Sequence, residues 1–181
     1  MRVTTGICKG RKLFVPKTHL VRPASDKVKQ SVFNIIGLVE NFSILDLFAG
    51  SGSMAIEGLS RGAAKSVLVD FLPEALKTIE RNIELCGFQG QAQVIRGKIP
   101  FILKTVKKIS PDPFDLVFVD PPYDHNLVNL TLDKLIENNL IDATSLIIIE
   151  HSPREKVSHE GYITIDHRKY GQTLMTFLNL K

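Results

Sequence analysis

The chain has 181 residues, of which 44% are hydrophobic and 23% are charged. This composition is typical of a folded globular protein, and it excludes a disordered tail, a collagen-like fibre and a small disulfide scaffold. No apolar run approaches the roughly 20 residues of a transmembrane helix, and the first residues lack the apolar core of a secretory signal. Cys8 and Cys86 have no metal-ligand spacing. We therefore expect a reduced, cytoplasmic protein with no metal and no membrane partner.

Positive charge is concentrated near the N-terminus. The net charge is +4, but residues 1–40 carry eight lysines and arginines against two acids, whereas the remaining residues carry 15 against 17. Such asymmetry predicts a basic face that meets a polyanion. The alternative is a solvated N-terminal arm, and charge alone does not decide between the two.

The basic extension, residues 1–40, is predicted to contain a hairpin and a helix. The hairpin is expected over residues 3–15 with its turn near Lys9 and Gly10, and the helix over residues 25–38 with Ser25 as its N-cap. We therefore divide the chain into this extension and a second part, residues 41–181.

From Ile44 onward, short apolar runs alternate with longer amphipathic stretches, which is typical of parallel strands joined by crossover helices. The strands are expected at 43–47, 66–70, 92–96, 114–119 and 145–150. The helices are expected at 53–61, 74–86, 99–109 and 126–138. Two alternating runs about Gly171, at 162–170 and 173–180, predict a closing antiparallel hairpin. The predicted fold class is α/β: a Rossmann-like, doubly wound, mostly parallel sheet of seven strands that ends in this hairpin.

A glycine-rich loop follows the first predicted strand. Gly50 and Gly52 let the backbone approach a ligand closely, and the helix that follows offers unpaired N–H groups. In an open α/β sheet this strand end lies beside the switch point where ligands bind. Asp70 ends the second strand 18 residues after Gly52, where its carboxylate is placed to accept hydrogen bonds from both hydroxyls of a ribose.

The sequence of this loop is compatible with more than one class of ligand. Gly50-x-Gly52-x-x-Ala55 also fits the fingerprint of a nicotinamide dinucleotide site. Asp46 tells against it, because a carboxylate at the end of the first strand repels a pyrophosphate and suits a cation such as S-adenosylmethionine. Phe48 is a candidate wall of the cofactor pocket, although a core role is equally plausible. A tight turn that binds nothing is the remaining alternative.

The sequence Asp120-Pro121-Pro122-Tyr123 ends the fourth predicted strand. An exocyclic amine of a nucleobase is a poor nucleophile because its lone pair is delocalised into the ring. Hydrogen bonds to the Asp120 carboxylate and the Pro121 carbonyl favour a more tetrahedral nitrogen, whose lone pair can attack a methyl sulfonium. The two prolines restrict the backbone, and Tyr123 offers a flat face for stacking. The alternative is a rigid turn after a buried strand.

These residues, in this order, resemble the class I S-adenosylmethionine-dependent methyltransferases that act on exocyclic amines. The chain is more specifically similar to the RsmD family of bacterial 16S rRNA guanine-N2 methyltransferases. The matching motifs are spread over nearly the whole length, and they are Gly6-x-x-x-Gly10-Arg11-Lys12-Leu13, Arg22-Pro23-x-x-Asp26-x-Val28-x-x-x-Val32-Phe33-Asn34, Asp46-Leu-Phe-Ala-Gly-Ser-Gly-Ser53, Glu57-x-Leu59-Ser60-Arg61-Gly62-Ala63, Asp120-Pro-Pro-Tyr123, Glu150-His151 and Tyr170-Gly171-x-Thr173.

The resemblance implies methylation of one guanine amine in 16S rRNA, on a small-subunit particle and with no obligate protein partner. It implies that residues 41–181 form the methyltransferase domain, and that the basic extension contacts RNA and covers the cofactor pocket. The expected catalytic residues are Asp120, Pro121, Pro122 and Tyr123. The expected cofactor-binding residues are Asp46, Phe48, Gly50, Gly52, Asp70, Gly97 and Lys98. The expected RNA-binding residues are Arg11, Lys12, Arg22, Lys27 and Lys29.

The chain departs from the family pattern at two cofactor positions. Asp70 replaces the longer glutamate that is frequent at the end of the second strand, which repositions the ribose contact slightly. Gly97-Lys98 stands where Gly-Asp is frequent, so the acid that would meet the adenine amine is missing. We expect backbone groups at residues 97–99 to serve there.

Three rival functions share part of this evidence. A DNA adenine-N6 methyltransferase uses the same tetrad, but this chain has no room for a separate target-recognition domain. A non-catalytic RNA-binding assembly factor could keep the fold, although the intact tetrad counts against it. A dinucleotide-dependent oxidoreductase is the third.

Overall fold

The computed structural model describes residues 1–17, 26–123, 125–157 and 160–181. These residues form two compact units, unit 1 over Met1–Arg96 and unit 2 over Gly97–Lys181. The basic extension belongs to unit 1 in this division, together with residues 41–96. Within the described residues, none of the helices combines the length and apolar character that crossing a membrane requires.

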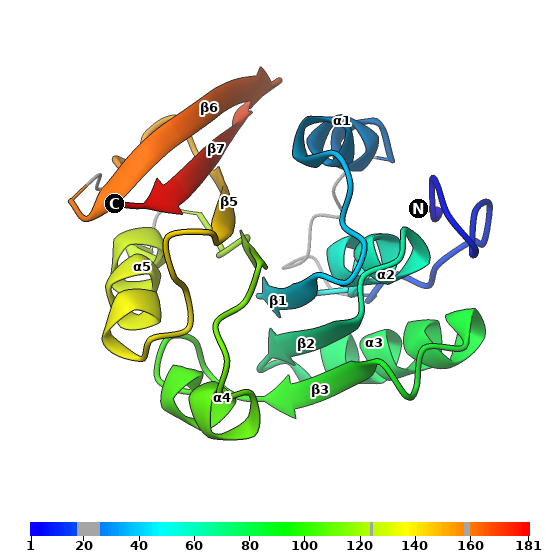
Figure 1. The fold of residues 1–181 in the computed structure, drawn as a ribbon. Coiled ribbons are helices and arrows are strands. Elements are labelled where there is room, and N and C mark those ends of the chain that lie inside the picture. The colour runs from blue at the N-terminus through cyan, green and yellow to red at the C-terminus, as the bar shows by residue number, and fades with distance from the viewer. Residues whose placement is uncertain (18–25, 124, 158–159) are drawn as a thin grey trace. The chain divides into compact units, whose positions relative to one another are not determined.

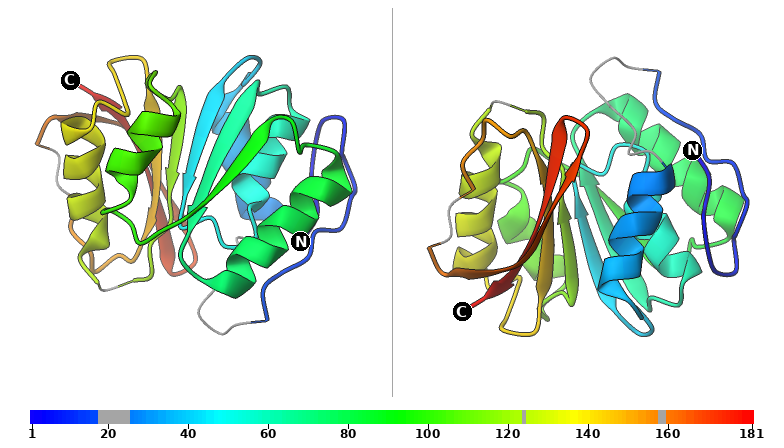
Figure 2. Two further views of the ribbon diagram at one scale, coloured as in Figure 1. Left: turned by 90° about the horizontal axis from the view of Figure 1, so that it is seen from below. Right: turned by 90° about the horizontal axis from the view of Figure 1, so that it is seen from above.

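Unit 1 contains three parallel strands in the spatial order β3-β2-β1. Its strands are β1 (Ser43–Leu47), β2 (Lys65–Asp70) and β3 (Ala92–Arg96). Its helices are α1 (Asp26–Ile36), α2 (Ser53–Ser60) and α3 (Pro73–Cys86). Figures 1 and 2 show α2 and α3 on one face of these strands, as βαβ crossovers of one hand require. Every residue of β1 is buried, which is typical of a parallel strand covered on both faces.

Unit 2 contains one parallel strand pair extended by an antiparallel hairpin, in the order β4-β5-β7-β6. Its strands are β4 (Leu116–Val119), β5 (Leu146–His151), β6 (Tyr162–Tyr170) and β7 (Thr173–Leu180). Its helices are α4 (Leu103–Ile109) and α5 (Leu127–Glu137), and both lie on one face of β4 and β5 (Figure 2). The C-terminal hairpin that the sequence predicts is present.

The predicted N-terminal hairpin is present, but its paired part is shorter than expected. One bridge, between Arg2 and Lys12, joins its two arms, together with hydrogen bonds from the N–H of Val3 to the Arg11 carbonyl at 3.0 Å and from the N–H of Leu13 to the Met1 carbonyl at 3.1 Å. The intervening loop binds α2 instead: the N–H of Ile7 donates to the Ser60 carbonyl at 2.9 Å, and the N–H of Cys8 donates to the Ser60 hydroxyl at 3.0 Å. These donors are therefore used for docking rather than for a ladder between the arms.

Two predicted helices differ from the expected bounds by more than one residue at one end. Helix α4 begins at Leu103 rather than at residue 99, because Ile99 precedes Pro100 and a residue before proline is disfavoured in the helical region. Helix α1 ends at Ile36, and Gly37 follows with φ +80°. The predicted N-cap of α1, Ser25, lies outside the described residues.

Candidate functional site

The glycine-rich loop after β1 has backbone angles that an ordinary residue rarely adopts. Gly50 and Gly52 have φ of 57° and 74°. A Cβ at Gly52 would lie 2.9 Å from Cδ2 of Leu68, so both the angle and the space require glycine there. Phe48 also has a positive φ, of 61°, which is uncommon for an aromatic residue and is typical of functional loops.

Asp46 lies near the end of β1, directly before this loop. It is 3% exposed, and its Oδ2 accepts a hydrogen bond of 3.1 Å from the N–H of Ala55 in the first turn of α2. Burial raises the pKa of Asp46 to about 7, with a smaller contribution from the nearby Asp70 carboxylate. A carboxylate whose charge is costly when buried gains from a cationic partner. The residue therefore fits a ligand that carries positive charge.

Asp70 fixes the loop from the end of β2. Its Oδ2 accepts a hydrogen bond of 2.9 Å from the N–H of Gly50, and its Oδ1 accepts one of 2.9 Å from the N–H of Leu72. Each carboxylate oxygen can accept a second hydrogen bond. Asp70 therefore has a loop-ordering role that the sequence did not indicate, and its contact with a ribose stays a prediction.

Asn82 of α3 is a buried residue that sequence reasoning missed. Its Nδ2 donates to the Ser51 carbonyl at 2.9 Å and to the Phe14 carbonyl at 3.0 Å, while its Oδ1 accepts from the Phe14 N–H at 2.8 Å. The side chain is fully buried. Asn82 thus joins the basic extension to the glycine-rich loop. An asparagine on the apolar side of a predicted helix was the available signal.

The two remaining cofactor candidates lie at the start of unit 2. A Cβ at Gly97 would lie 2.4 Å from Cγ1 of Ile102, so the glycine permits a close turn. Lys98 is exposed, and its carbonyl accepts a hydrogen bond of 3.1 Å from the N–H of Ile102. How adenine is recognised at residues 97–99 stays a prediction.

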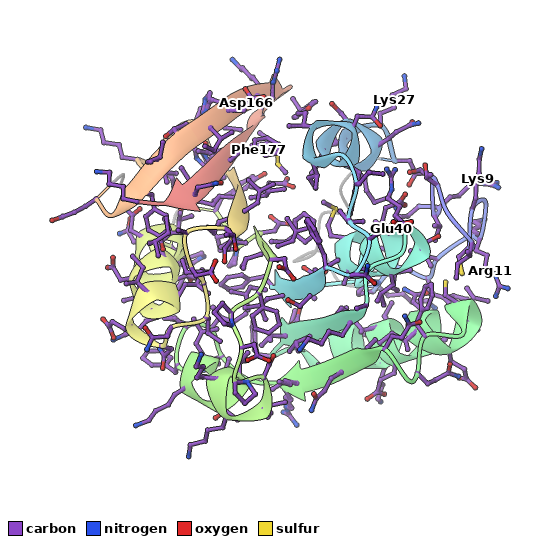
Figure 3. All side chains as sticks on the ribbon, viewed as in Figure 1. Lys9, Arg11, Lys27, Glu40, Asp166 and Phe177 are labelled. Carbon is purple, nitrogen blue, oxygen red and sulfur yellow. The ribbon has the colours of Figure 1, made fainter. Side chains whose placement is uncertain are left out.

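Most of the described basic candidates for RNA binding lie at the surface of unit 1. Lys12 and Lys27 are exposed, and Arg11 is exposed while donating a hydrogen bond to the carbonyl of Leu85. Figure 3 shows Lys9, Arg11 and Lys27 projecting outward from the N-terminal loop and from α1. Arg22 lies outside the described residues.

Lys29 is the exception, and its prediction as an RNA contact is wrong. Its side chain is 0% exposed, and its Nζ lies 3.5 Å from Oε2 of the equally buried Glu57. The ammonium also donates to the Arg2 carbonyl at 2.6 Å. Burial lowers the pKa of Lys29, while the Glu57 carboxylate opposes that shift. The Lys29 ammonium therefore pairs with groups inside unit 1 and is not presented to RNA.

Glu57 of α2 organises the same interior. Its carboxylate accepts hydrogen bonds from the Thr4 N–H at 2.8 Å, the Thr4 hydroxyl at 2.6 Å and the Thr5 N–H at 3.0 Å. The Nε of Arg61 pairs with it at 3.0 Å. The N-terminal segment is thus anchored to α2 through one buried acid.

The tetrad ends β4 in unit 2. Pro121 is buried, Pro122 is exposed, and Asp120 is half-buried. The Tyr123 hydroxyl donates to Oε1 of Glu150 at 3.2 Å and lies 2.8 Å from the Thr173 hydroxyl. Burial raises the pKa of Tyr123 to about 12 and also raises the pKa of Glu150. The tyrosine ring is therefore held at its far end by β5 and β7.

The sequence could not place Glu150 and Thr173 beside the tetrad by spacing alone, since they come from strands 27 and 50 residues away. The signal was that both belong to the motifs on which the family resemblance rests. Their contact with one hydroxyl gives those motifs a physical role: they orient Tyr123.

Comparison with known proteins agrees with this reading of the fold. The family model described as "Conserved hypothetical protein 95" matches residues 1–179. Ribosomal RNA small subunit methyltransferase D from Haemophilus influenzae is 34% identical over 153 residues, which cover 83% of this chain and 78% of the relative. "Putative rRNA methyltransferase YlbH" from Bacillus subtilis is 36% identical over 152 residues, which cover 83% and 82%.

Solved structures give the same result over the full length. The structure titled "Putative methyltransferase yhhF from Escherichia coli" has a TM-score of 0.84 and 27% identity, and the match covers 100% of this chain and 98% of that one. A structure titled as a "putative methylase" from Haemophilus influenzae has a TM-score of 0.80 and 29% identity, and the match covers 99% of this chain and 98% of that one. The predicted Rossmann-like methyltransferase fold is confirmed. The chain belongs to the Conserved hypothetical protein 95 family, and its resemblance to the RsmD methyltransferases is confirmed.

Proposed function

We propose that this protein transfers a methyl group from S-adenosylmethionine to the exocyclic N2 amine of a guanine in 16S rRNA, within a small-subunit particle in the cytoplasm. Most of the proposed cofactor-binding residues belong to unit 1, and the residues proposed to hold the target base belong to unit 2. The observation that carries the proposal is the fixed Tyr123, which follows the Asp120 carboxylate and the Pro121 carbonyl and is held by Glu150 and Thr173.

The residues of unit 1 fit the proposed cofactor. S-adenosylmethionine supplies a methyl group on a sulfonium centre and also carries an ammonium group and a ribose. Asp46 is a buried carboxylate that gains from a positive partner. Asp70 keeps acceptor capacity for hydroxyl groups beyond the two N–H groups that it already binds. The positive φ values of Gly50 and Gly52 let the backbone approach the ligand.

The tetrad of unit 2 fits the proposed target. Asp120 and Pro121 offer two acceptors to the two hydrogens of an exocyclic amine, which localises the lone pair of its nitrogen. Tyr123 offers a flat face to the base, and hydrogen bonds at its hydroxyl keep the ring from rotating away. A positioned reactant lowers the entropic part of the barrier.

Two observations favour rRNA as the substrate. Relatives that align over most of the chain are named ribosomal RNA small subunit methyltransferases, including those from Haemophilus influenzae and Escherichia coli. Lys9, Arg11 and Lys27 also place exposed positive charge on the N-terminal part of unit 1 (Figure 3). Exposed cations that neutralise phosphates supply much of the affinity for a nucleic acid.

The test uses a cofactor with a labelled methyl group. The purified protein is incubated with unmodified small-subunit particles and, separately, with duplex DNA, and the labelled nucleoside is identified by mass spectrometry. N2-methylguanosine from the rRNA is the expected product. If N6-methyladenine from the DNA is the only labelled product, the proposed role of the tetrad in binding an exocyclic amine stands, and rRNA is rejected as the substrate.

An Asp120→Ala variant separates an enzyme from an assembly factor. We expect it to bind RNA like the wild type and to lose methyl transfer, since the removed carboxylate is an acceptor for the amine. Unchanged methyl transfer would remove Asp120 from the proposed site.

A further inference from the structure

The register of the C-terminal hairpin identifies a second set of residues on the same side of the sheet as Tyr123. Directly paired residues on antiparallel strands share a face. Glu150 pairs with Met175 across β5 and β7, and Met175 pairs with Arg168 across β7 and β6. Arg168 therefore lies on the face that carries Glu150, to which the Tyr123 hydroxyl is hydrogen-bonded.

Tyr170 belongs to the same face. It pairs directly with Thr173, whose hydroxyl lies 2.8 Å from the hydroxyl of Tyr123. Paired residues have Cβ atoms about 5 Å apart. Two tyrosines thus lie on either side of Thr173, one at the end of β4 and one at the end of β6.

The opposite face of the hairpin is chemically distinct. There the Thr176 hydroxyl lies 2.8 Å from Nε2 of His151 and 2.9 Å from Nδ1 of His167. Lys169 lies two residues after His167 and therefore shares that face. Asp166 and Phe177, which are paired in the register, lie with Arg168 on the first face.

We propose that Tyr170 and Arg168 form a second RNA-binding surface, which holds the nucleotide next to the target guanine. This proposal rests on the proposed function. The half-exposed ring of Tyr170 stacks on the neighbouring base, and the Arg168 guanidinium binds a phosphate of the same strand. Arg168 is 56% exposed and uses its Nε for Asp166 at 2.9 Å. That ion pair leaves the two terminal amino groups for a phosphate and orients the guanidinium.

This surface explains how a flipped base could be held open. When the target base leaves the stack of the RNA, its ring needs a new stacking partner. The adjacent base, which has lost its stacking contact with the target, needs one as well. Tyr123 serves the target in the proposed reaction. Tyr170 serves its neighbour, which stabilises the open state of the RNA before chemistry begins.

Four variants test the surface: Tyr170→Leu, Tyr170→Phe, Arg168→Ala and, as the matched control, Lys169→Ala. The readouts are kcat and KM for unmodified small-subunit particles, and RNA affinity over a salt series. We expect Tyr170→Leu to raise KM about tenfold with kcat nearly kept, while Tyr170→Phe behaves like the wild type, because stacking needs the ring and not the hydroxyl. Arg168→Ala should reduce the salt slope of log K by about 0.7, the value for one phosphate of a single strand. Lys169→Ala should leave the slope unchanged.

The outcomes separate this proposal from the proposed function. If wild-type protein labels guanosine but Arg168→Ala and Tyr170→Leu match Lys169→Ala, the second surface is rejected and the methyltransferase assignment stands. If the wild type labels no rRNA, the proposed function itself fails. Because Arg168 is exposed, its variant reports on the surface even where Tyr170→Leu lowers stability.

Discussion

The Asp46 carboxylate accepts a hydrogen bond of 3.1 Å from the N–H of Ala55, so the end of β1 caps the start of α2 through a side chain. Gly52, the residue before that helix, makes no side-chain cap of its own. The acid therefore satisfies a helix donor that would be unpaired, and it keeps a second oxygen for a ligand. One residue both builds the loop and gives it negative charge.

Asp46 should make cofactor binding depend on pH near neutrality. Its pKa in the folded protein is raised to about 7 by burial, so its charged form increases as pH rises through that value. We expect the affinity for S-adenosylmethionine to increase between pH 6 and pH 8, measured by calorimetry. Asp46→Asn keeps an acceptor for Ala55 but removes the charge, and it should weaken binding about tenfold at pH 8 while flattening the pH dependence. A pH profile unchanged in this variant would contradict the assignment.

The same carboxyl should affect stability in the opposite direction. The folded protein retains a proton on Asp46 that the unfolded chain releases, because the folded pKa is raised. The free energy of unfolding contributed by this group is therefore fully present below about pH 4 and is lost as pH rises to about 7. Unfolding in urea without cofactor should show this fall for the wild type, and Asp46→Asn should lack it. Equal pH dependence in the two proteins would place the titration elsewhere.

Asn82 should stabilise unit 1 through its three hydrogen bonds. Asn82→Ala leaves the N–H and carbonyl of Phe14 and the carbonyl of Ser51 without this partner. The contact with Ser51 is buried, and the two with Phe14 are partly buried. An unsatisfied buried group costs about 1–3 kcal/mol, so we expect a clear fall in the free energy of unfolding. Glu80→Ala, at an exposed position of the same helix, is the control and should change stability little. If the two variants unfold alike, the junction has no energetic role.

The regular elements were predictable because their periodicity is strong. β1, β3, β6 and β7 have the bounds that alternation and apolar runs indicate. The burial of polar residues in the interior was not predictable in the same way. A charge count treats every lysine as solvated, and nothing local reveals that the acid opposite Lys29 is Glu57, on another helix. Burial of a charge depends on a partner that only the fold brings near.

The tetrad was recognisable from the sequence, and the stacking role of Tyr123 stays a prediction, whereas the hydrogen-bond partners of Tyr123 were not predictable. The tetrad can be recognised from two consecutive prolines after an apolar strand, which is a local feature of the sequence. Glu150 and Thr173 approach it through the pairing of β5 with β7 and the packing of the tetrad against them.

Removing the hydrogen bonds of the Tyr123 hydroxyl should have smaller effects than removing the Tyr123 ring. Tyr123→Phe should reduce kcat about threefold, while Tyr123→Ala should raise the KM for RNA about tenfold or more, as loss of a stacked base predicts. Equal losses in both variants would assign the main role to the hydroxyl.

Lys27 and Lys29 of α1 provide a matched comparison for the role of the basic extension. Lys27 is exposed, and Lys29 is buried against Glu57. We expect Lys27→Met to lower RNA affinity and to reduce its salt slope, since a charge that neutralises a phosphate releases a counterion. Lys29→Met should leave the slope unchanged and instead lower stability by about 3–5 kcal/mol, because it leaves a buried carboxylate short of its partner. Arg61 remains beside Glu57 at 3.0 Å, so the low end of that range is expected. A reduced salt slope for Lys29→Met, in a variant that remains folded, would restore Lys29 as an RNA contact.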